Sequence, residues 1–312
     1  MNRRRRLRLA AAVLAVAGTA SGVTAADAVS PSSHLPRTGH AALTRSVAAC
    51  NADASSIRPA GPPRVTPGSY LATIKARGYL IAGVDQNTYH FGFLNPLDGH
   101  TEGFDIDMVN AVAKAIFGRA DQSTVHLKAI SDDQRIPAVT SGSVDIVAHT
   151  MTITCDRLRQ VDFSSVYFDA AQRVLVQKDS AVRKLADLKG QRVCATTGST
   201  SLGTIDSVGA IGVGVRYWTD CLVLLQQGDV AAISTDDSIL AGLAAQDPFT
   251  VLVGDRLTHE PYGLAIAKQH PEFVQFVNAV LEQLRTDGQW ADSYRHWIGS
   301  PAPAPPSAQY GS

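Results

Sequence analysis

Two hydrophobic patterns recur along the chain between about residue 68 and residue 298. Short apolar runs bounded by glycine, proline or polar residues predict buried strands, and apolar residues three and four positions apart predict amphipathic helices. The helix expected over residues 104–117 shows the second pattern, with Asp105 suited to its N-cap and Gly118 directly after its end. Its apolar face consists of Met108, Val109, Val112 and Ile116.

The predicted elements alternate between strand and helix along this whole region. Helices are expected between most of the strands, and two of them, over residues 271–286 and 289–298, end the region. This alternation predicts an α/β fold with mostly parallel sheets, in which ligands bind beyond the carboxyl ends of the strands. Strands are expected at residues 79–84, 125–130, 144–148, 173–177, 191–195, 213–217, 230–234, 250–253 and 263–267.

The two ends of the chain differ from this pattern. Residues 1–25 begin with an arginine cluster, continue with an apolar run and end in an A-x-A-like site, which is typical of a cleaved signal peptide. The apolar run is shorter than the roughly 20 residues of a membrane span, so an anchor is disfavoured. Residues 26–67 are rich in Pro, Ser and Ala and predict a linker, and residues 299–312 predict a disordered, Pro-rich tail. We therefore expect an exported protein, either secreted or associated with the cell envelope.

Composition excludes several classes of protein. Hydrophobic residues make up 45% of the chain and charged residues 18%, enough for a real core. The 28 basic and 28 acidic residues cancel, so no basic field is available to bind nucleic acid. The chain lacks G-x-S-x-G, H-E-x-x-H, Walker A and G-x-G-x-x-G motifs and paired C-x-x-C cysteines. We therefore expect no catalytic residues, no metal and no cofactor.

One segment with ligand-binding chemistry follows the strand predicted at residues 144–148. Thr150 and Thr152 offer hydroxyl and backbone donors there, and Arg157 offers a guanidinium group that binds carboxylates in a bidentate manner. Spacing alone leaves an equal alternative, in which the threonines form an ordinary loop and Arg157 makes a surface ion pair.

Two further polar segments also follow predicted strands. Ser199 and Thr200 come after residues 191–195 and resemble an anion-binding helix N-terminus, although ordinary capping is the favoured interpretation. Asp236 comes after residues 230–234 and is suited to an ammonium group or to an N-cap. Together with the first segment they place anion and cation receptors at one edge of the fold. This combination is what a zwitterionic ligand requires.

Several short motifs occur in a fixed order from about Leu71 to Ile298. They are GFDID (103–107), SVDI (143–146), MTITCDR (151–157) with VDFS (161–164), RVC (192–194) with GSTS (198–201), DCL (220–222) with LQQ (225–227), STDD (234–237), PYG (261–263) and DGQW (287–290). In this order they resemble the family 3 extracellular solute-binding proteins of amino-acid ABC importers, closest to the actinobacterial glutamine/glutamate/aspartate-binding group. The resemblance implies a two-lobed, periplasmic-binding-protein-like fold (type II) with a ligand cleft between the lobes.

The resemblance also implies where the lobes lie along the chain. Lobe 1 would comprise residues 68–166 and 257–298, and lobe 2 would comprise residues 167–256. Two crossing strands would join them, and the ligand would favour a closed state about this hinge.

The same resemblance implies roles for the polar residues of the cleft. Arg157 would grip the α-carboxylate of the ligand, helped by Thr150, Thr152, Thr200 and neighbouring backbone amides, and Ser199 would also belong to the ligand-binding residues. Asp236 would receive the α-ammonium group. Many relatives have glycine at the position of Thr150, so the approach of the backbone to the carboxylate is expected to differ here.

The residues expected to read the ligand side chain give conflicting indications. Arg135 resembles the arginine of glutamate/aspartate binders, whereas Asp85 lies where glutamine binders place a carboxylate. An aromatic that many relatives stack on the ligand is replaced by Thr88, and Phe91 or Tyr89 would compensate. The ligand is therefore expected among aspartate, glutamate and their amides.

Four cysteines, Cys50, Cys155, Cys194 and Cys221, predict disulfides in an exported chain. Of the three possible connectivities, we expect Cys194–Cys221 within lobe 2 and Cys50–Cys155 fixing the N-terminal segment to lobe 1. A rival interpretation treats residues 47–50 as a lipobox for acylation of Cys50, but a lipobox should close the apolar run.

We therefore expect a monomeric receptor that binds a small amino acid and presents its closed form to an ABC permease or a membrane sensor complex. The main alternative is an enzyme on the same fold, a cyclohexadienyl dehydratase-like lyase. A further alternative is a degenerate two-lobed protein without a ligand. The presence of both Arg157 and Asp236 argues against it, because unpaired charges in a cleft are costly.

Overall fold

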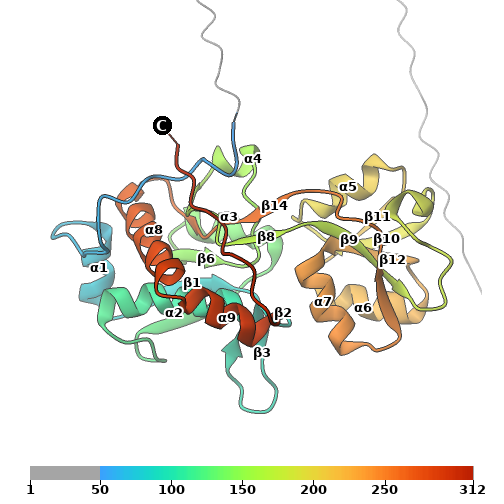
Figure 1. Ribbon diagram of the computed structural model, residues 1–312, viewed down its shortest axis with the longest axis horizontal. Coiled ribbons are helices and arrows are strands. Elements are labelled where there is room, and N and C mark those ends of the chain that lie inside the picture. The colour runs from blue at the N-terminus through green and yellow to red at the C-terminus, as the bar shows by residue number, and fades with distance from the viewer. Residues whose placement is uncertain (1–49, 312) are drawn as a thin grey trace, which may run out of the picture. The chain divides into compact units, whose positions relative to one another are not determined.

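The computed structural model describes residues 50–311, which form two α/β lobes, each built on a five-stranded sheet (Figure 1). The expected signal peptide and the first part of the expected linker, residues 26–49, lie outside the described residues. Within residues 50–311 no helix combines the length and the apolar character that crossing a membrane requires.

Lobe 1 is built on a sheet with the order β5–β1–β6–β15–β7. β5, β1 and β6 are parallel, and β15 pairs antiparallel with β6 and β7. The apolar faces of four helices share one core with this sheet, which also explains the 3.6-residue periodicity in their sequences. The strands are β1 (Leu80–Val84), β5 (Val125–Ala129), β6 (Ile146–Ala148), β7 (Asp162–Phe163) and β15 (Ala265–Ile266), and the helices are α1 (Tyr70–Arg77), α2 (Phe104–Phe117), α8 (Pro271–Thr286) and α9 (Gln289–Trp297).

Three shorter elements complete the part of lobe 1 that carries polar residues. The 3-10 turn η1 (Asp132–Gln134) leads directly into α3 (Arg135–Thr140), and α4 (Cys155–Leu158) follows the end of β6 after a short loop. Apolar residues of α3, β6 and β15 form a second, smaller core that holds these elements in place.

Lobe 2 is built on a sheet with the order β11–β10–β12–β9–β13. β11, β10 and β12 are parallel, and β9 pairs antiparallel with β12 and β13. Three helices pack on it and share one apolar core with the strands. The strands are β9 (Gln172–Gln177), β10 (Arg192–Thr196), β11 (Ile211–Val215), β12 (Ala232–Asp236) and β13 (Thr250–Val253), and the helices are α5 (Ser201–Ser207), α6 (Trp218–Gln227) and α7 (Asp237–Gln246).

Two paired strands connect the sheets. The chain leaves lobe 1 through β8 (Phe168–Ala170) and returns through β14 (Glu260–Tyr262), and these strands pair antiparallel. A small sheet, β2 (Asn87–Thr88), β3 (Gly92–Leu94) and β4 (Thr101–Glu102), follows β1. Phe91 links this sheet to the connecting strands, because its ring packs edge-on against Phe168 and Tyr262.

The predicted elements agree closely with the structure, with three differences. α8 occupies the predicted range, and each of the nine predicted strands occurs with small shifts of its ends. Both sheets are mixed rather than mostly parallel, because β9, β13, β7 and β15 run against their neighbours. The small β2–β3–β4 sheet and the short strands β7, β8 and β14 were not predicted. Asp105 is not the N-cap of α2, since Gly103 holds that position and the Asp105 side chain is buried.

The segments expected to be a linker and a disordered tail pack on lobe 1 in the structure. The buried Asn278 side chain of α8 donates from Nδ2 to Ser56 Oγ and to the Ile57 carbonyl, both at 2.7 Å. The hydroxyl of Tyr310 donates to Glu282 at 2.5 Å, and Ser56 and Tyr310 form a β-bridge. Composition alone did not reveal these contacts, because they depend on single polar side chains of α8.

The structure contains two disulfides, Cys50–Cys155 and Cys194–Cys221, which are the expected pairs. The first joins the start of the described chain to α4 and engages the sulfur that the lipobox interpretation would acylate. The second joins β10 to α6 in the core of lobe 2, where both cysteines are fully buried. It closes a loop with a sequence separation of 27 residues.

Replacing Cys194 and Cys221 together by alanine is expected to lower the free energy of unfolding by about 3 kcal/mol. The reason is that the disulfide restricts the unfolded chain, and a loop of this length gains much conformational entropy in the unfolded state when the cross-link is removed. Urea denaturation of the variant and of the unmodified protein measures the difference. A strong reductant should remove most of this difference, which serves as the control. A difference below about 1 kcal/mol without reductant would contradict the prediction.

Candidate functional site

One small cavity is lined by residues of both lobes. The lining residues follow the carboxyl ends of β5 and β6 in lobe 1 and of β10, β11 and β12 in lobe 2. This is the edge at which α/β sheets bind ligands. The lining consists of Asp132, Arg135, Thr150, Thr152 and Arg157 from lobe 1, and Ser199, Thr200, Ser201, Trp218, Thr235, Asp236 and Ile239 from lobe 2.

Arg157 brings a positive charge without an acidic partner to this cavity. The Thr154 side chain caps α4 by accepting from the Arg157 amide, and this contact places the guanidinium group beneath the cavity. Its nitrogens donate to the carbonyls of Thr152 (2.7 Å) and Gly198 (3.0 Å), and within the described residues it forms no ion pair. Burial and the charge of Arg135 lower the pKa of Arg157 to about 9, so it remains charged at neutral pH. The surface ion pair considered above is therefore not formed.

Thr150 offers a free hydroxyl beside this charge. Its side chain is buried, and its Oγ1 has no hydrogen-bond partner among the described residues. Its φ of 41° lies in the left-handed region, which is strained for a β-branched residue. Asp105 holds this backbone by accepting from the Thr150 amide at 2.8 Å, and Tyr167 in turn donates to Asp105 at 2.6 Å. Strain of this kind is typical of ligand-binding positions.

Asp236 brings a carboxyl group to the opposite side of the cavity. It ends β12 at the N-cap position of α7, but its side chain makes no capping hydrogen bond. It accepts instead from the Tyr262 hydroxyl at 2.5 Å and has no basic partner within the described chain. Burial, with the nearby charge of Glu260, raises the pKa of Asp236 to about 8. A cation in the cavity would therefore stabilise its ionised form.

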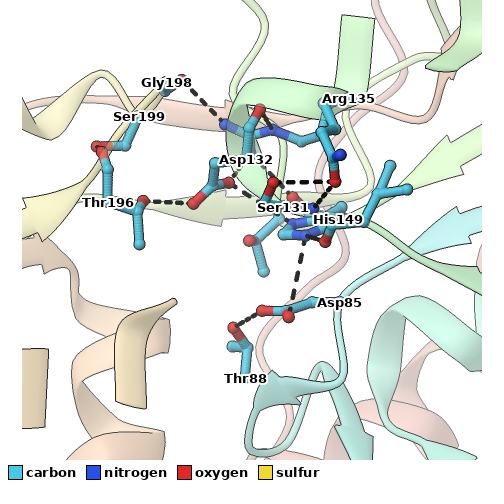
Figure 2. Close-up of polar contacts among 12 residues, drawn as sticks. Asp85, Thr88, Ser131, Asp132, Arg135, His149, Thr196, Gly198 and Ser199 are labelled. Atoms are coloured by element: carbon cyan, nitrogen blue, oxygen red, sulfur yellow. Dashed lines mark hydrogen bonds and ion pairs between the residues drawn. The ribbon is translucent and has the colours of Figure 1, made fainter. Parts of the chain in front are cut away.

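Arg135 lines the same cavity, but its donors are mostly engaged, as Figure 2 shows. It forms a buried ion pair with Asp132 (2.7 Å) and donates to the carbonyls of Asp132, His149 and Gly198. Burial acts to raise the pKa of Asp132, but the charges of Arg135, His149 and Arg157 and the hydrogen bond from Thr196 together hold that pKa below its usual value. Thr196 of lobe 2 also donates to Asp132, so this pair connects the two lobes.

The structure does not bring Asp85 or Phe91 to the cavity. Asp85 forms a local turn, in which it accepts from the Gln86 amide (2.7 Å), the Asn87 amide (3.0 Å) and the Thr88 hydroxyl. Phe91 is fully buried in the aromatic cluster next to the connecting strands. Neither residue is among those that line the cavity.

Ser199 and Thr200 do line the cavity, but neither caps α5. Ser199 donates to the Thr196 carbonyl at 2.7 Å, and Thr200 donates to Glu260 at 3.1 Å. Thr152 lies opposite them and contributes a buried hydroxyl. Ser199 therefore bonds to the nearby backbone and Thr200 to the side chain of Glu260, and neither makes a capping hydrogen bond.

Three polar residues near the site were missed by the sequence analysis. Asp132 and Trp218 each follow a strand end, so the carboxyl-end rule used for Thr150 and Asp236 could have found them. Glu260 carried no such signal, because β14 is a short strand that the hydrophobic pattern did not predict. Glu260 is nevertheless buried, and its carboxylate accepts a hydrogen bond from the hydroxyl of Thr200 in lobe 2.

The fold and the site define a two-lobed receptor with an unpaired guanidinium group and an unpaired carboxyl group facing one cavity. The chain matches the sequence profile of the bacterial extracellular solute-binding proteins, family 3, over residues 80–300, and it belongs to this family.

The relatives are named as amino-acid-binding proteins. The chain is similar to the ABC transporter glutamine-binding protein GlnH of Bacillus subtilis, with 36% identity over 73% of this chain and 84% of that protein. It is also similar to the glutamate-binding protein GluB of Corynebacterium efficiens, with 32% identity over 70% and 78%. Among solved structures, an ancestral arginine-binding protein bound to glutamine has a TM-score of 0.67 and 34% identity, covering 72% of this chain and 99% of that one.

The affinity for a zwitterionic ligand is expected to rise from about pH 6 to about pH 8. In the empty cavity Asp236 is mostly protonated below its pKa of about 8, and an ammonium group binds its ionised form. Binding at lower pH must therefore release a proton, which weakens the affinity by up to about tenfold per pH unit.

Isothermal titration calorimetry across this pH range measures the effect, and buffers with different ionisation enthalpies report the proton release directly. The variant D236N is the control, because it lacks the titrating group and should show weaker binding that is independent of pH over this range. An affinity of the unmodified protein that is constant from about pH 6 to about pH 8 would contradict the assignment of Asp236.

Proposed function

We propose that the protein is an exported receptor that binds aspartate, glutamate or their amides between its two lobes. The observation that carries this proposal is the pair of unpaired, buried and opposite groups, Arg157 and Asp236, which face the same cavity from different lobes. The buried charge of Arg157 costs several kcal/mol without an acidic partner, and burial keeps Asp236 mostly protonated until a cation binds, so a ligand that carries both charges would complete both groups. An α-amino acid carries the two complementary charges.

In the proposed complex the ligand replaces or joins the present hydrogen-bond partners of Arg157, Thr150 and Asp236. The ligand α-carboxylate would accept from the guanidinium of Arg157, which now donates to the carbonyls of Thr152 and Gly198. The free hydroxyl of Thr150 lies at the same side of the cavity and would donate to a carboxylate oxygen. The α-ammonium group would contact Asp236, which Tyr262 already orients.

The expected ligand class rests on the relatives and on the polar residues of the site. The relatives described above are named as glutamine- and glutamate-binding proteins. The cavity is lined mostly by polar residues of both lobes. The ion pair of Arg135 with Asp132 stands beside it and presents both a donor and an acceptor to the ligand side chain.

Ligand binding would favour a closed state about β8 and β14. Contacts that such a state requires are present, because Arg135 and Arg157 of lobe 1 donate to Gly198 of lobe 2. We propose that the closed protein, as a monomer, then meets an ABC permease or a membrane sensor complex. Export agrees with the extracellular family and with the two disulfides.

The alternative is a lyase on the same fold. One similar solved structure is an ancestral amino acid-binding protein described as a precursor of cyclohexadienyl dehydratase, with 34% identity and a TM-score of 0.67 over 74% of this chain. The raised pKa of Asp236 would suit a general acid. That ancestral protein is itself described as amino acid-binding, and burial beside Glu260 accounts for the raised pKa of Asp236 without a catalytic role. We therefore favour binding.

Replacing Arg157 by alanine is expected to weaken amino-acid binding by about 100-fold or more, because the buried α-carboxylate loses its charged partner. Replacing it by lysine keeps the charge but not the planar donor fork, so an intermediate loss is expected. Calorimetric titration with each of the standard amino acids measures both effects and identifies the ligand.

The variant R159A is the matched control, because Arg159 lies two residues further on and is mostly exposed in an ion pair with Asp156. It should bind as the unmodified protein does. No heat with any amino acid in the unmodified protein would overturn the proposed function and would direct attention to lyase activity.

Replacing Gly242 by alanine tests closure without touching the ligand. A Cβ atom at Gly242, within α7 of lobe 2, would lie 2.6 Å from the carbonyl oxygen of Tyr89 in lobe 1. The variant G242A should therefore hold the lobes apart and weaken binding by about tenfold or more, while alanine itself favours the helix. Small-angle X-ray scattering with and without ligand, together with calorimetry, measures both effects.

Gly203 provides the matched control for this experiment. It lies in α5 of the same lobe, and a Cβ atom there would meet nothing within 4 Å. G203A should close and bind normally. If G242A binds as tightly as G203A, the lobes do not approach each other at this point in the bound protein.

A further inference from the structure

Trp218 has a buried indole N–H that no group of the described protein accepts. The residue lines the cavity, is 2% exposed, and its Nε1 atom has no hydrogen-bond partner among the described residues. An indole nitrogen is a donor only, and a buried donor left unpaired costs free energy. The other two tryptophans do not share this feature. Trp290 donates to the Tyr167 carbonyl and Trp297 donates to Asp107, both at 2.8 Å.

The sheet of lobe 2 places Trp218 far from the group assigned to the ligand ammonium. Trp218 follows β11, and Asp236 ends β12, with β10 between these two strands. Because neighbouring strands are about 4.8 Å apart, the two strand ends are separated by roughly 10 Å along this edge. An amino acid whose ammonium group contacts Asp236 would therefore extend its side chain toward Trp218.

We propose that Trp218 selects the ligand by donating its indole N–H to an oxygen atom of the ligand side chain. This inference rests on the proposed function and deepens it, because it names the side-chain chemistry that the site accepts. A carboxylate or a carboxamide oxygen accepts such a bond, whereas an ammonium or guanidinium group has no acceptor to offer. The site therefore takes amino acids with a carbonyl oxygen in the side chain and rejects basic and purely aliphatic ones.

The variant W218F tests this inference, because phenylalanine keeps an aromatic ring in the core of lobe 2 and removes only the donor and part of the volume. The probes are aspartate, asparagine, glutamate, glutamine and norvaline, and norvaline has the aliphatic side chain without an oxygen. In the unmodified protein the best oxygen-bearing ligand should bind about tenfold to hundredfold more tightly than norvaline. In W218F this ratio should fall to about threefold or less. Using the ratio cancels any general loss of packing or stability.

The variant W297F is the matched control, since it removes an indole donor of the same kind from α9 of lobe 1. It should leave the ratio unchanged. An unchanged ratio in W218F would overturn the role of Trp218 while leaving the receptor function intact. Absence of binding by the unmodified protein to all five probes and to every other standard amino acid would overturn both.

A spectroscopic measurement on the unmodified protein does not depend on how the variant folds. The chain contains three tryptophans, so a proton–nitrogen correlation spectrum contains three indole signals, and the variants assign them. The Trp218 indole proton should shift downfield on saturation with the oxygen-bearing ligand and much less with norvaline. Equal shifts with both ligands would contradict a hydrogen bond to the side-chain oxygen.

Discussion

Two buried guanidinium groups of lobe 1 donate to one carbonyl oxygen of lobe 2, that of Gly198, and the rest of the site is arranged around this contact. Arg135 is neutralised by its ion pair with Asp132, but Arg157 has only carbonyl partners within the described residues. The contact also requires glycine, because Gly198 has a φ of 89° and a Cβ atom there would lie 2.8 Å from the backbone of Asp133. The lobes therefore meet at a point where a positive charge is left without an acid.

The remaining polar groups are held by the apolar framework. Tyr262 of a connecting strand packs in the aromatic cluster with Phe91 and Phe168, and its hydroxyl orients Asp236. Tyr167 similarly orients Asp105, which fixes the strained backbone of Thr150. The hydrophobic cores thus fix the positions of the polar groups. Some of these polar groups still have hydrogen-bonding atoms without a partner among the described residues at the cavity. A preorganised site of this kind loses little conformational entropy when the ligand binds.

The sequence predicted the framework better than the side-chain contacts. Hydrophobic periodicity located α8 and the central strands, because their burial dictates the pattern. The carboxyl-end rule located Thr150, Arg157 and Asp236, which the structure brings together at one cavity. It could not show that Asp85 would be used in a turn, since an aspartate that forms a turn and one that binds a ligand look alike in sequence. The packing of Tyr310 on α8 was hidden for a similar reason, because it depends on a partner far away in the chain.

In the proposed complex, a zwitterion completes the guanidinium group of Arg157 and the carboxyl group of Asp236. The most direct test is a crystal structure of the protein grown with the amino acid that calorimetry identifies. We expect a ligand carboxylate on the guanidinium of Arg157, a ligand ammonium on Asp236, and a lengthened or broken contact from Arg157 to the Gly198 carbonyl. A ligand bound elsewhere, or bound here with Arg157 still donating to Gly198 and Asp236 contacting only Tyr262, would contradict it.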